Sequence, residues 1–455
     1  MHTQVPARFH KRHPATPPRH AAPRRPGAVT GATAGAVTGA RAGAVTGARA
    51  HIAPLDGLRG VAVAAVLFFH AGHFGGGFLG VDLFFVLSGF LITGLLLRGA
   101  AAGGVDLAAF WGRRVRRLFP ALALTVAGSL VLTWLFASAS VRTFALDDAP
   151  WTLANIANWH FIAEQIGYWN SGEERVFSHL WSIAVEEQFY LLWPLVLCVL
   201  AHGRHAHRWV AAVAGAGALG SLALMLLLVD PLDTTRVYEG TDTRASALLL
   251  GALMATGPVR GLLARLGARR VAALCGALIA GLAAYWVLTD GQEAPGLFRG
   301  GLFAHSLACA LLIALLARRP GSLPGRVLGA APLRLLGTLS YSLYLWHWPV
   351  YVLLSEERLG FGGWPRTAVL LAVSVAAAAL TKVLVEDPVR FKCRWARGRS
   401  GLCAFAGCVA ALVLLWWVLP APQAGGESVD IGRLTSAAPA SSAAPASAVA
   451  SAAGE

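Results

Sequence analysis

An arginine and a histidine share one face of the first apolar helix that the sequence predicts. Residues 55–90 are almost wholly apolar, and within them Arg59 precedes His70 by eleven positions. At about 100° per residue, this spacing returns to within about 20° of the same helix face, about 16 Å further along the axis. An ionisable residue inside a membrane costs about 2.5–3.5 kcal/mol, so it is usually paired or functional. These two residues alone fit an active site and a snorkelling arginine beside a packed histidine equally well.

Four arginines occupy five positions at the start of the third apolar stretch, in the sequence FWGRRVRRLFP. Anchoring at a membrane boundary explains part of this cluster. Guanidinium groups also bind phosphate bidentately, so we favour a phosphate clamp. The cluster consists of Arg113, Arg114, Arg116 and Arg117.

Two acidic clusters also fall inside apolar stretches. Glu186 and Glu187 are adjacent in HLWSIAVEEQFYLLWP, and at least one of them must meet a cation, a hydrogen-bond donor or a proton. Asp82 and Ser88 lie in GVDLFFVLSGF, where Gly80 and Gly89 would permit close helix packing. For Asp82 and Ser88, a packing motif with one hydrogen-bonded acid is as good an interpretation as a binding site.

A polar stripe follows near the end of the chain, in LGTLSYSLYLWHWPV. Ser340, Tyr344 and His347 are spaced i, i+4 and i+7, so they lie on one helix face that lines a cavity or a helix contact. Asp242 and Arg244 are two positions apart and do not share a face. We therefore expect each of these two to pair with a residue elsewhere.

The composition predicts that helices in a membrane position these groups. Of 455 residues, 56% are hydrophobic and 13% charged, against about 25% charged in soluble proteins, and the mean hydropathy is +0.59. The net charge is +15, but basic residues gather in short loops beside apolar spans, which argues against nucleic acid as a partner. The six cysteines form no CxxC pair, and we expect no metal site. The predicted fold is an all-α, polytopic transmembrane helical bundle.

Eleven apolar stretches are long enough to span the bilayer. The connecting segments alternate between arginine-rich and acidic, which predicts a multi-pass protein of the plasma membrane with a cytoplasmic N-terminus and an extracytoplasmic C-terminus. The stretches are 56–73, 78–98, 119–138, 179–200, 209–229, 241–256, 270–288, 298–316, 333–355, 366–385 and 401–420.

The chain divides into four parts. Residues 1–53 are expected to form a disordered basic cytoplasmic tail with a repeated GAVTGA, and residues 421–455 a disordered Ala/Ser/Pro-rich extracytoplasmic tail. Between them lie a ten-helix membrane domain, 54–392, and an additional transmembrane helix, 393–420. The long outer loop 139–178 carries several aromatic residues that suit the membrane interface or acceptor binding. From the residues alone, a group-transfer enzyme with a phosphate-bearing donor and a proton-coupled transporter both remain open.

The motifs in series resemble those of the integral-membrane acyltransferase 3 family. They are LDGLRG…LFFHAG, GVDLFFVLSGFLI, RRVRRLFPAL, HLWSIAVEEQFYLLWP, TDTRASALLLGALMA, LSYSLYLWHWP and VEDPVR, and they cover about residues 54–392. Members of this family O-acylate surface polysaccharides, peptidoglycan, lipid-linked sugars and some antibiotics. The resemblance implies ten transmembrane helices and an acyl-CoA donor taken from the cytoplasm, with no bound cofactor.

The family motifs map onto residues already singled out. The arginine-x10-histidine motif corresponds to Arg59 and His70, and the paired acid to Glu186 and Glu187. The Arg-x-Arg element maps most simply onto Arg114 and Arg116, although the doubled RRVRR leaves the register open. The usual E-x-P element reads Glu386-Asp387-Pro388 here, a small departure.

The resemblance implies transfer of an acyl group, acetyl being the first expectation, from acyl-CoA to a hydroxyl of a cell-surface glycan, lipid-linked sugar or secreted metabolite. His70 would act as general base or be transiently acylated, with Glu186 or Glu187 orienting its ring. Tyr344 and Ser340 would be oxyanion donors. Some members continue into an esterase-like domain, so a separate extracytoplasmic esterase-like partner or direct transfer would complete delivery. The alternative is a transporter or flippase for an acylated or lipid-linked substrate.

Overall fold

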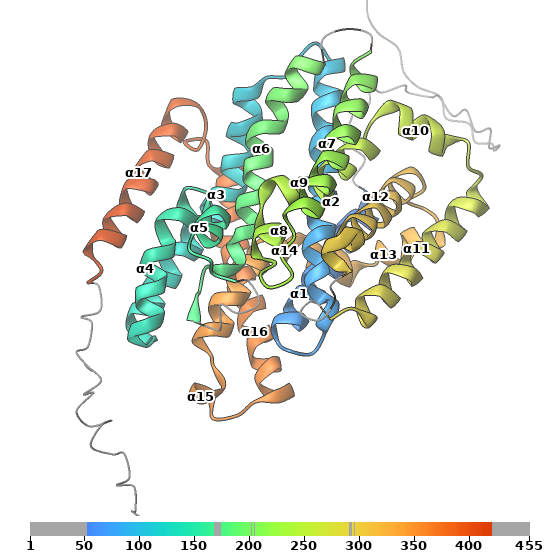
Figure 1. Cartoon of the computed structure of the whole chain (residues 1–455). Helices are drawn as coiled ribbons and strands as arrows, with labels where there is room; N and C mark the ends of the chain where they lie inside the picture. The colour runs from blue at the N-terminus through green and yellow to red at the C-terminus, as the bar shows by residue number, and fades with distance from the viewer. Residues whose placement is uncertain are drawn as a thin grey trace, which may run out of the picture. The chain divides into compact units, whose positions relative to one another are not determined.

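The computed structural model of the chain describes residues 52–167, 174–201, 203, 205–290, 294 and 296–420. Every regular element within these residues is a helix (Figure 1), which confirms the predicted all-α class. Of the predicted tail 1–53, residues 1–51 lie outside the described residues and Ala53 already begins α1; the predicted tail 421–455 also lies outside, as do Tyr168 and Trp169 of the long loop.

Nine helical segments in the described residues are long and apolar enough to cross a membrane, and a bent pair formed by α8–α9 and α10 makes a tenth. The remaining expected span is α14, which is long but carries the polar stripe that lowers its hydropathy. The long helices are α1 (Ala53–His70), α2 (Gly80–Ala101), α3 (Leu107–Phe136), α6 (Trp181–Leu200), α7 (Ala206–Leu228), α9 (Thr241–Met254), α11 (Ala268–Leu288), α12 (Leu302–Arg318), α14 (Ala331–Leu353), α16 (Gly363–Thr381) and α17 (Gly398–Val418).

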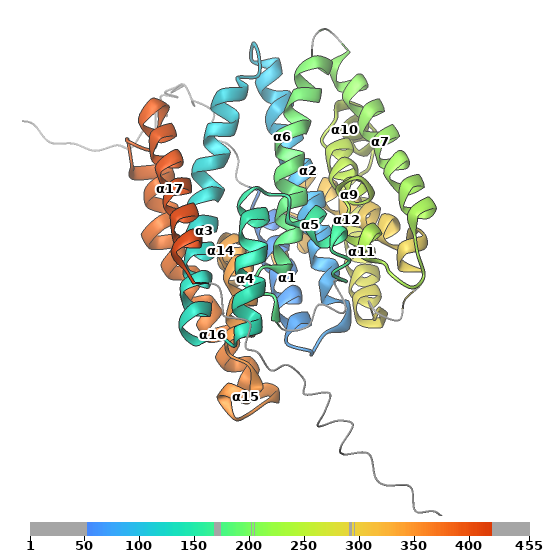
Figure 2. The ribbon, with the colours of Figure 1, turned by 60° about the vertical axis from the view of Figure 1, so that its left-hand side comes forward.

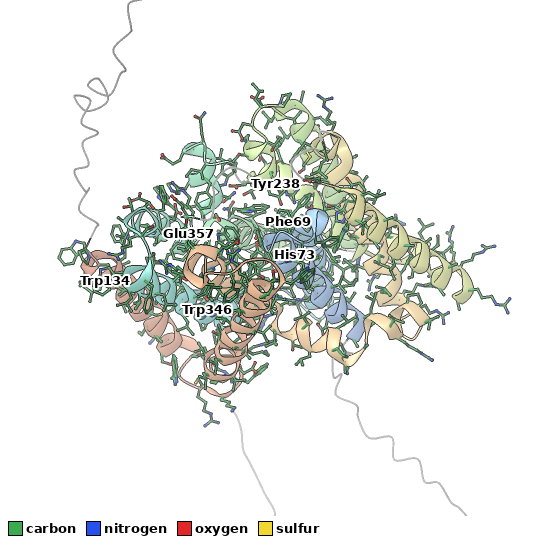
Figure 3. The ribbon with its side chains drawn as sticks, turned by 90° about the horizontal axis from the view of Figure 1, so that it is seen from below. Phe69, His73, Trp134, Tyr238, Trp346 and Glu357 are labelled. Carbon is green, nitrogen blue, oxygen red and sulfur yellow. The ribbon has the colours of Figure 1, made fainter. Side chains whose placement is uncertain are left out.

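Short helices connect these segments. They are η1 (Gly75–Leu79), α4 (Ala139–Leu153), α5 (Ala157–Ala163), η3 (Ser178–Leu180), α8 (Thr235–Glu239), α10 (Gly257–Ala264), η4 (Leu297–Gly301), α13 (Leu323–Leu328), α15 (Glu356–Leu359), η5 (Lys382–Glu386) and η6 (Pro388–Lys392). The four arginines lie near the start of α3, and we call this end of the bundle the basic end. We call the opposite end, where α1 finishes at His70, the histidine end; Figure 3 looks onto it, with Phe69 and His73 labelled.

Glycines bring α1 and α14 into backbone contact. A Cβ atom at Gly60 would lie 2.3 Å from the carbonyl oxygen of Leu333, and one at Gly337 would lie 1.8 Å from that of Asp56. Only glycine permits so close an approach, as at small-residue interfaces of membrane helices. As a result, side chains from α1 and α14 meet directly along their length.

The helix α2 packs in the same way, which confirms the role predicted for its glycines. A Cβ at Gly80 would lie 2.5 Å from the Ala62 carbonyl oxygen of α1, and one at Gly89 would lie 1.8 Å from the Leu248 carbonyl oxygen of α9. The helix α2 is therefore clamped between α1 and α9.

Prolines inside three helices create hydrogen bonds to other elements. A proline lacks the N–H that would bind the carbonyl four residues earlier, so that carbonyl must find another donor. Pro150, Pro194 and Pro349 lie within α4, α6 and α14, respectively. The freed carbonyls accept hydrogen bonds from side chains. Trp416 Nε1 donates to the Leu146 carbonyl (2.8 Å), Trp111 Nε1 to that of Tyr190 (3.0 Å) and His179 Nε2 to that of Leu345 (3.2 Å).

The last described helix, α17, lies at the edge of the bundle against α3 and α4 (Figure 2). Leu412 is its one buried side chain among the described residues, and its other apolar side chains are half-buried or exposed. This pattern suits a helix that faces lipid on most sides and is not needed to enclose the interior.

Candidate active site

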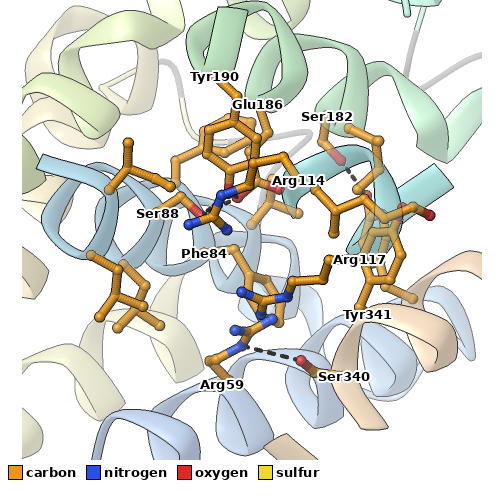
Figure 4. A pocket seen from close by; sticks show the side chains of 18 residues that line it. Arg59, Phe84, Ser88, Arg114, Arg117, Ser182, Glu186, Tyr190, Ser340 and Tyr341 are labelled. Carbon is orange, nitrogen blue, oxygen red and sulfur yellow. Dashed lines mark hydrogen bonds between the residues drawn. The ribbon is translucent and has the colours of Figure 1, made fainter. Parts of the chain in front are cut away.

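A pocket of about 750 Å³, including its open mouth, lies between α1, α2, α3, α6 and α14 (Figure 4). Each of these helices contributes at least one polar side chain, so most of the predicted site residues meet here. The polar lining residues are Arg59, Ser88, Arg114, Arg117, Ser182, Glu186, Tyr190, Ser340, Tyr341 and Tyr344. Apolar residues, chiefly from α2, complete the wall.

Three arginines give this pocket an excess of positive charge over its one carboxylate. Arg59 Nε donates to Ser340 Oγ at 3.3 Å, which fixes it against α14. The guanidinium of Arg114 lies 5.3 Å from the centre of the Tyr190 ring, within cation–π range. Arg117 lines the same space from α3. A site of this kind favours an anionic ligand, and phosphate in particular.

Glu186 is held by hydroxyl groups within the pocket wall. The hydroxyls of Ser88 and Tyr190 both donate to its Oε1 atom, the latter at 2.6 Å. Tyr190 OH and Ser88 Oγ lie 2.9 Å apart, so the three side chains form a closed cluster that joins α2 to α6. The sequence predicted a donor for at least one of the paired acids, and for Glu186 the donors are these hydroxyls.

A group of histidines lies beyond the pocket, toward the histidine end. His70 Nδ1 and His347 Nε2 are 3.0 Å apart, and His347 Nδ1 lies 2.6 Å from the Tyr344 carbonyl oxygen. His179 completes the group, with its ring centre 5.3 Å from that of His347. Trp348 packs on His70 at 4.7 Å between ring centres. Within the described residues, no such group of histidines and acids is placed to hold a metal ion.

Tyr344 separates the pocket from the histidines. Its side chain lines the pocket, and its hydroxyl lies 2.6 Å from Ser182 Oγ and donates to the His179 carbonyl at 2.9 Å. The same ring lies 5.3 Å from the centre of the His347 ring. Tyr344 therefore contacts both the pocket and the histidine group.

Several predicted site residues lie outside the described pocket lining. Arg116 Nη1 reaches the Ala396 carbonyl at 3.4 Å, and Arg113 is exposed. Asp82 forms an ion pair with Arg244, which confirms that Arg244 pairs with a distant residue and not with Asp242. Glu187, adjacent to Glu186, is also absent from the described lining residues.

Besides the carboxylates that the sequence proposed as orienting groups for His70, the structure brings a second imidazole against this ring. The sequence had placed His347 among the substrate-binding residues. In the structure, His347 Nε2 faces His70 Nδ1. The reason is the parallel packing of α1 on α14, which brings together residues 277 positions apart.

Sequence reasoning missed four residues of this region: Ser182, Tyr190, Tyr341 and Trp348. Tyr190 was accessible from spacing, because it follows Glu186 by four positions and shares its helix face. Tyr341 lies three positions before Tyr344 and Trp348 four positions after it, so both border the predicted polar stripe. Helical spacing could therefore have found them as well.

The helices, the arginine-lined pocket and the buried histidines are those of a polytopic membrane protein with a polar interior. The model of the acyltransferase domain, acyltransferase 3 type, matches residues 52–383. The chain belongs to this acyltransferase family, which confirms the resemblance found in its motifs.

Curated relatives cover three quarters of the chain. It is 38% identical over 356 residues to YrhL of Bacillus subtilis, named as a candidate peptidoglycan O-acetyltransferase. It is 36% identical over 351 residues to the O-acetyltransferase OatA of Staphylococcus aureus, and 34% over 350 residues to the peptidoglycan O-acetyltransferase OatA of Listeria monocytogenes. Each alignment spans 75% of this chain but only 55%, 58% and 56% of the respective relative. No solved structure matches the chain significantly.

Proposed function

We propose that this protein is a membrane O-acyltransferase that moves an acyl group, acetyl in the first instance, from acyl-CoA to a hydroxyl of a cell-surface glycan, lipid-linked sugar or secreted metabolite. One observation carries the proposal. Three arginines line one pocket, and the helix α1, which contributes Arg59 to it, ends at His70. Names of the relatives support acetyl as the group and a glycan as the acceptor.

The pocket suits the donor. Coenzyme A carries several phosphates, and guanidinium groups bind phosphate through paired, charge-assisted hydrogen bonds. Arg59, Arg114 and Arg117 line one space and face a single carboxylate there. In the proposed complex, the phosphates lie at these arginines and the acyl thioester points toward Tyr344.

His70 supplies the chemistry in either of two routes. In direct transfer, the acceptor oxygen bonds to the acyl carbon while His70 takes the hydroxyl proton; the C–S bond then breaks, and the proton passes to the leaving sulfur. In the covalent route, His70 attacks the acyl carbon, the C–S bond breaks, and the imidazole N–H proton passes to the leaving sulfur. The acceptor oxygen then bonds to the acyl carbon as the C–N bond breaks, and its proton returns to the ring. Both routes give the O-acyl product and free CoA.

The proposed orientation follows from the charge of the loops. The basic end faces the cytoplasm, where acyl-CoA is found, and the histidine end faces outward in the plasma membrane. In that arrangement the donor enters beside the arginines, and the acceptor approaches His70 from the other side. A separate extracytoplasmic esterase-like protein remains a candidate partner for final delivery.

The test is an acyl-transfer assay with the full chain in proteoliposomes. Radiolabelled acetyl-CoA is added on one side, peptidoglycan fragments and lipid-linked sugars serve as acceptors, and product and free CoA are measured. Replacing His70 by Ala is expected to abolish transfer. The matched control is His73→Ala, because His73 follows in the next turn but stacks on Trp364 with 4.0 Å between ring centres.

Two results would contradict the proposal. Normal transfer by His70→Ala would remove the catalytic assignment. Movement of label across the membrane without a new covalent bond, in wild type and with every acceptor, would favour a transporter.

A further inference from the structure

We infer that His347 is a positioning residue that fixes the His70 imidazole in the tautomer with its proton on Nδ1, so that Nε2 is the reacting nitrogen. The inference rests on the proposed function and assigns His347 a different role from substrate binding. It follows from four hydrogen-bonding atoms in a row: the Tyr344 carbonyl oxygen, the two ring nitrogens of His347, and His70 Nδ1.

The first step fixes the proton of His347. Its Nδ1 lies 2.6 Å from the Tyr344 carbonyl oxygen, which only accepts hydrogen bonds. An unprotonated Nδ1 would place two lone pairs against each other at this distance. Nδ1 therefore carries the hydrogen, and in the neutral ring Nε2 carries the lone pair.

The second step fixes the proton of His70. His347 Nε2 lies 3.0 Å from His70 Nδ1, a normal hydrogen-bond distance. Because His347 Nε2 is the acceptor, His70 Nδ1 must be the donor. The carbonyl of Val66, one turn earlier in α1, is a second acceptor beside the same ring. The lone pair of neutral His70 then belongs to Nε2.

The surroundings of His347 make it a rigid reference. Its side chain is fully buried, and α14 is locked to α1 by the contact of Gly337 with the backbone. Pro349, two residues on, frees the Leu345 carbonyl, which accepts from His179 and holds that ring beside His347. His347 thus serves His70 as the orienting group serves the histidine of a catalytic triad, but as a neutral acceptor.

Kinetics of reconstituted variants separate positioning from packing. His347→Leu removes the acceptor and is expected to lower kcat by about 10²–10⁴-fold, the range lost with a general base or with a wrong histidine tautomer. The KM for acyl-CoA should change by less than about threefold, because the arginines are untouched. His347→Gln restores an acceptor oxygen and should recover at least about tenfold of the lost kcat. Tyr351→Phe, which removes another α14–α1 hydrogen bond at this end, is the control and should stay near wild type.

Three kinetic results would overturn the inference while leaving acyl transfer intact. They are an unchanged kcat in His347→Leu, a rise in KM alone, and an equal loss in the Gln and Leu variants. Absence of any transfer by wild-type protein would instead overturn the proposed function on which the inference depends.

A spectroscopic measurement needs neither activity nor a folded His347 variant. Wild-type protein with ¹⁵N-labelled histidine rings is placed in bilayers and examined by solid-state NMR at a pH where the rings are neutral. The signals that vanish in His70→Ala are expected to show a protonated Nδ1 hydrogen-bonded to the unprotonated nitrogen of a second imidazole. A protonated Nε2 on His70 would refute the assignment.

Discussion

Asp82 and Arg244 form an ion pair 2.8 Å long in which each side chain is only 1% exposed. Ser306 donates to the second carboxylate oxygen at 3.2 Å, and the Tyr238 ring lies 5.0 Å from the guanidinium carbon. The pair joins α2 to α9 outside the described pocket lining. Its place in the bundle therefore favours a structural role for Asp82 over substrate binding.

Breaking this pair is expected to destabilise the fold strongly. Arg244→Ala leaves a buried carboxylate without its cation, a change that typically costs about 3–5 kcal/mol. The thermal unfolding temperature of the detergent-solubilised variant should fall well below that of wild type, and the Asp82→Leu/Arg244→Met double variant should recover much of the loss. Arg236→Ala is the matched control: its ion pair with Asp242 is 31% and 34% exposed and is worth about 0–1 kcal/mol. Equal melting of the two alanine variants would contradict the expectation.

The pocket arginines should act on donor binding. A hydrogen bond to a charged group contributes about 1.5–3 kcal/mol, so Arg114→Ala and Arg117→Ala are each expected to raise the KM for acyl-CoA by about 10- to 100-fold. Arg113→Ala, at an exposed side chain outside the pocket lining, is the control and should leave the KM unchanged. Arg116→Ala tests the register: a rise in KM equal to that of Arg114→Ala would favour the Arg-x-Arg pairing over the pair seen in the pocket.

Glu186 can be tested as a wall residue or as a catalytic acid. Glu186→Gln keeps an acceptor for the Ser88 and Tyr190 hydroxyls, so kcat should stay within about tenfold of wild type. Glu186→Leu removes that acceptor, and unpaired hydroxyls should distort the pocket and raise the KM for acyl-CoA. Initial rates over a range of donor concentrations distinguish the two effects. A loss of about 100-fold or more in kcat for Glu186→Gln would restore the catalytic role.

Residue types and helical period predicted most of the fold, because both are local properties. Apolar stretches located the helices, and the shared face of Arg59 and His70 follows from their spacing. The arginine register was also within reach: Arg114 and Arg117 are three apart and share a face, whereas Arg116 is turned away from Arg114. The helical period therefore favours Arg114 and Arg117, the pair that lines the pocket.

Contacts between distant segments were beyond the sequence. Nothing in the spacing of α1 shows that His347 faces His70, or that Asp82 meets Arg244 across 162 positions. Such contacts depend on how closely two helix backbones approach, and here glycines such as Gly60 and Gly337 set that approach. Glycine positions suggest which helices touch, but only the packed bundle fixes which side chains meet.

A buried carboxyl in α4, outside the candidate spans, should make stability depend on pH. Asp148 is 0% exposed, with Oδ1 2.6 Å from Arg175 and 3.3 Å from His160. Burial raises the pKa of Asp148 to about 7; Arg175 opposes this rise, and the neighbouring Asp147 adds to it. Since an unfolded aspartate has a pKa of about 3.9, the folded chain binds this proton more tightly. The protonated Asp148 therefore contributes its full stabilisation of the fold below about pH 4. This contribution declines as the pH rises toward 7 and is lost above that.

The measurement is the difference in unfolding temperature between wild type and Asp148→Asn from about pH 4 to 8. Asparagine does not titrate, so wild type should lose stability relative to the variant as the pH rises through this window. His160 acts in the opposite direction, because burial lowers its pKa, so His160→Gln is introduced into both proteins to leave Asp148 as the titrating member of this contact. Glu357→Gln, at an exposed acid in α15, is the control and should give a nearly flat difference. A flat curve for Asp148→Asn would mean that Arg175 holds the carboxylate charged throughout, and that the ion pair outweighs its burial.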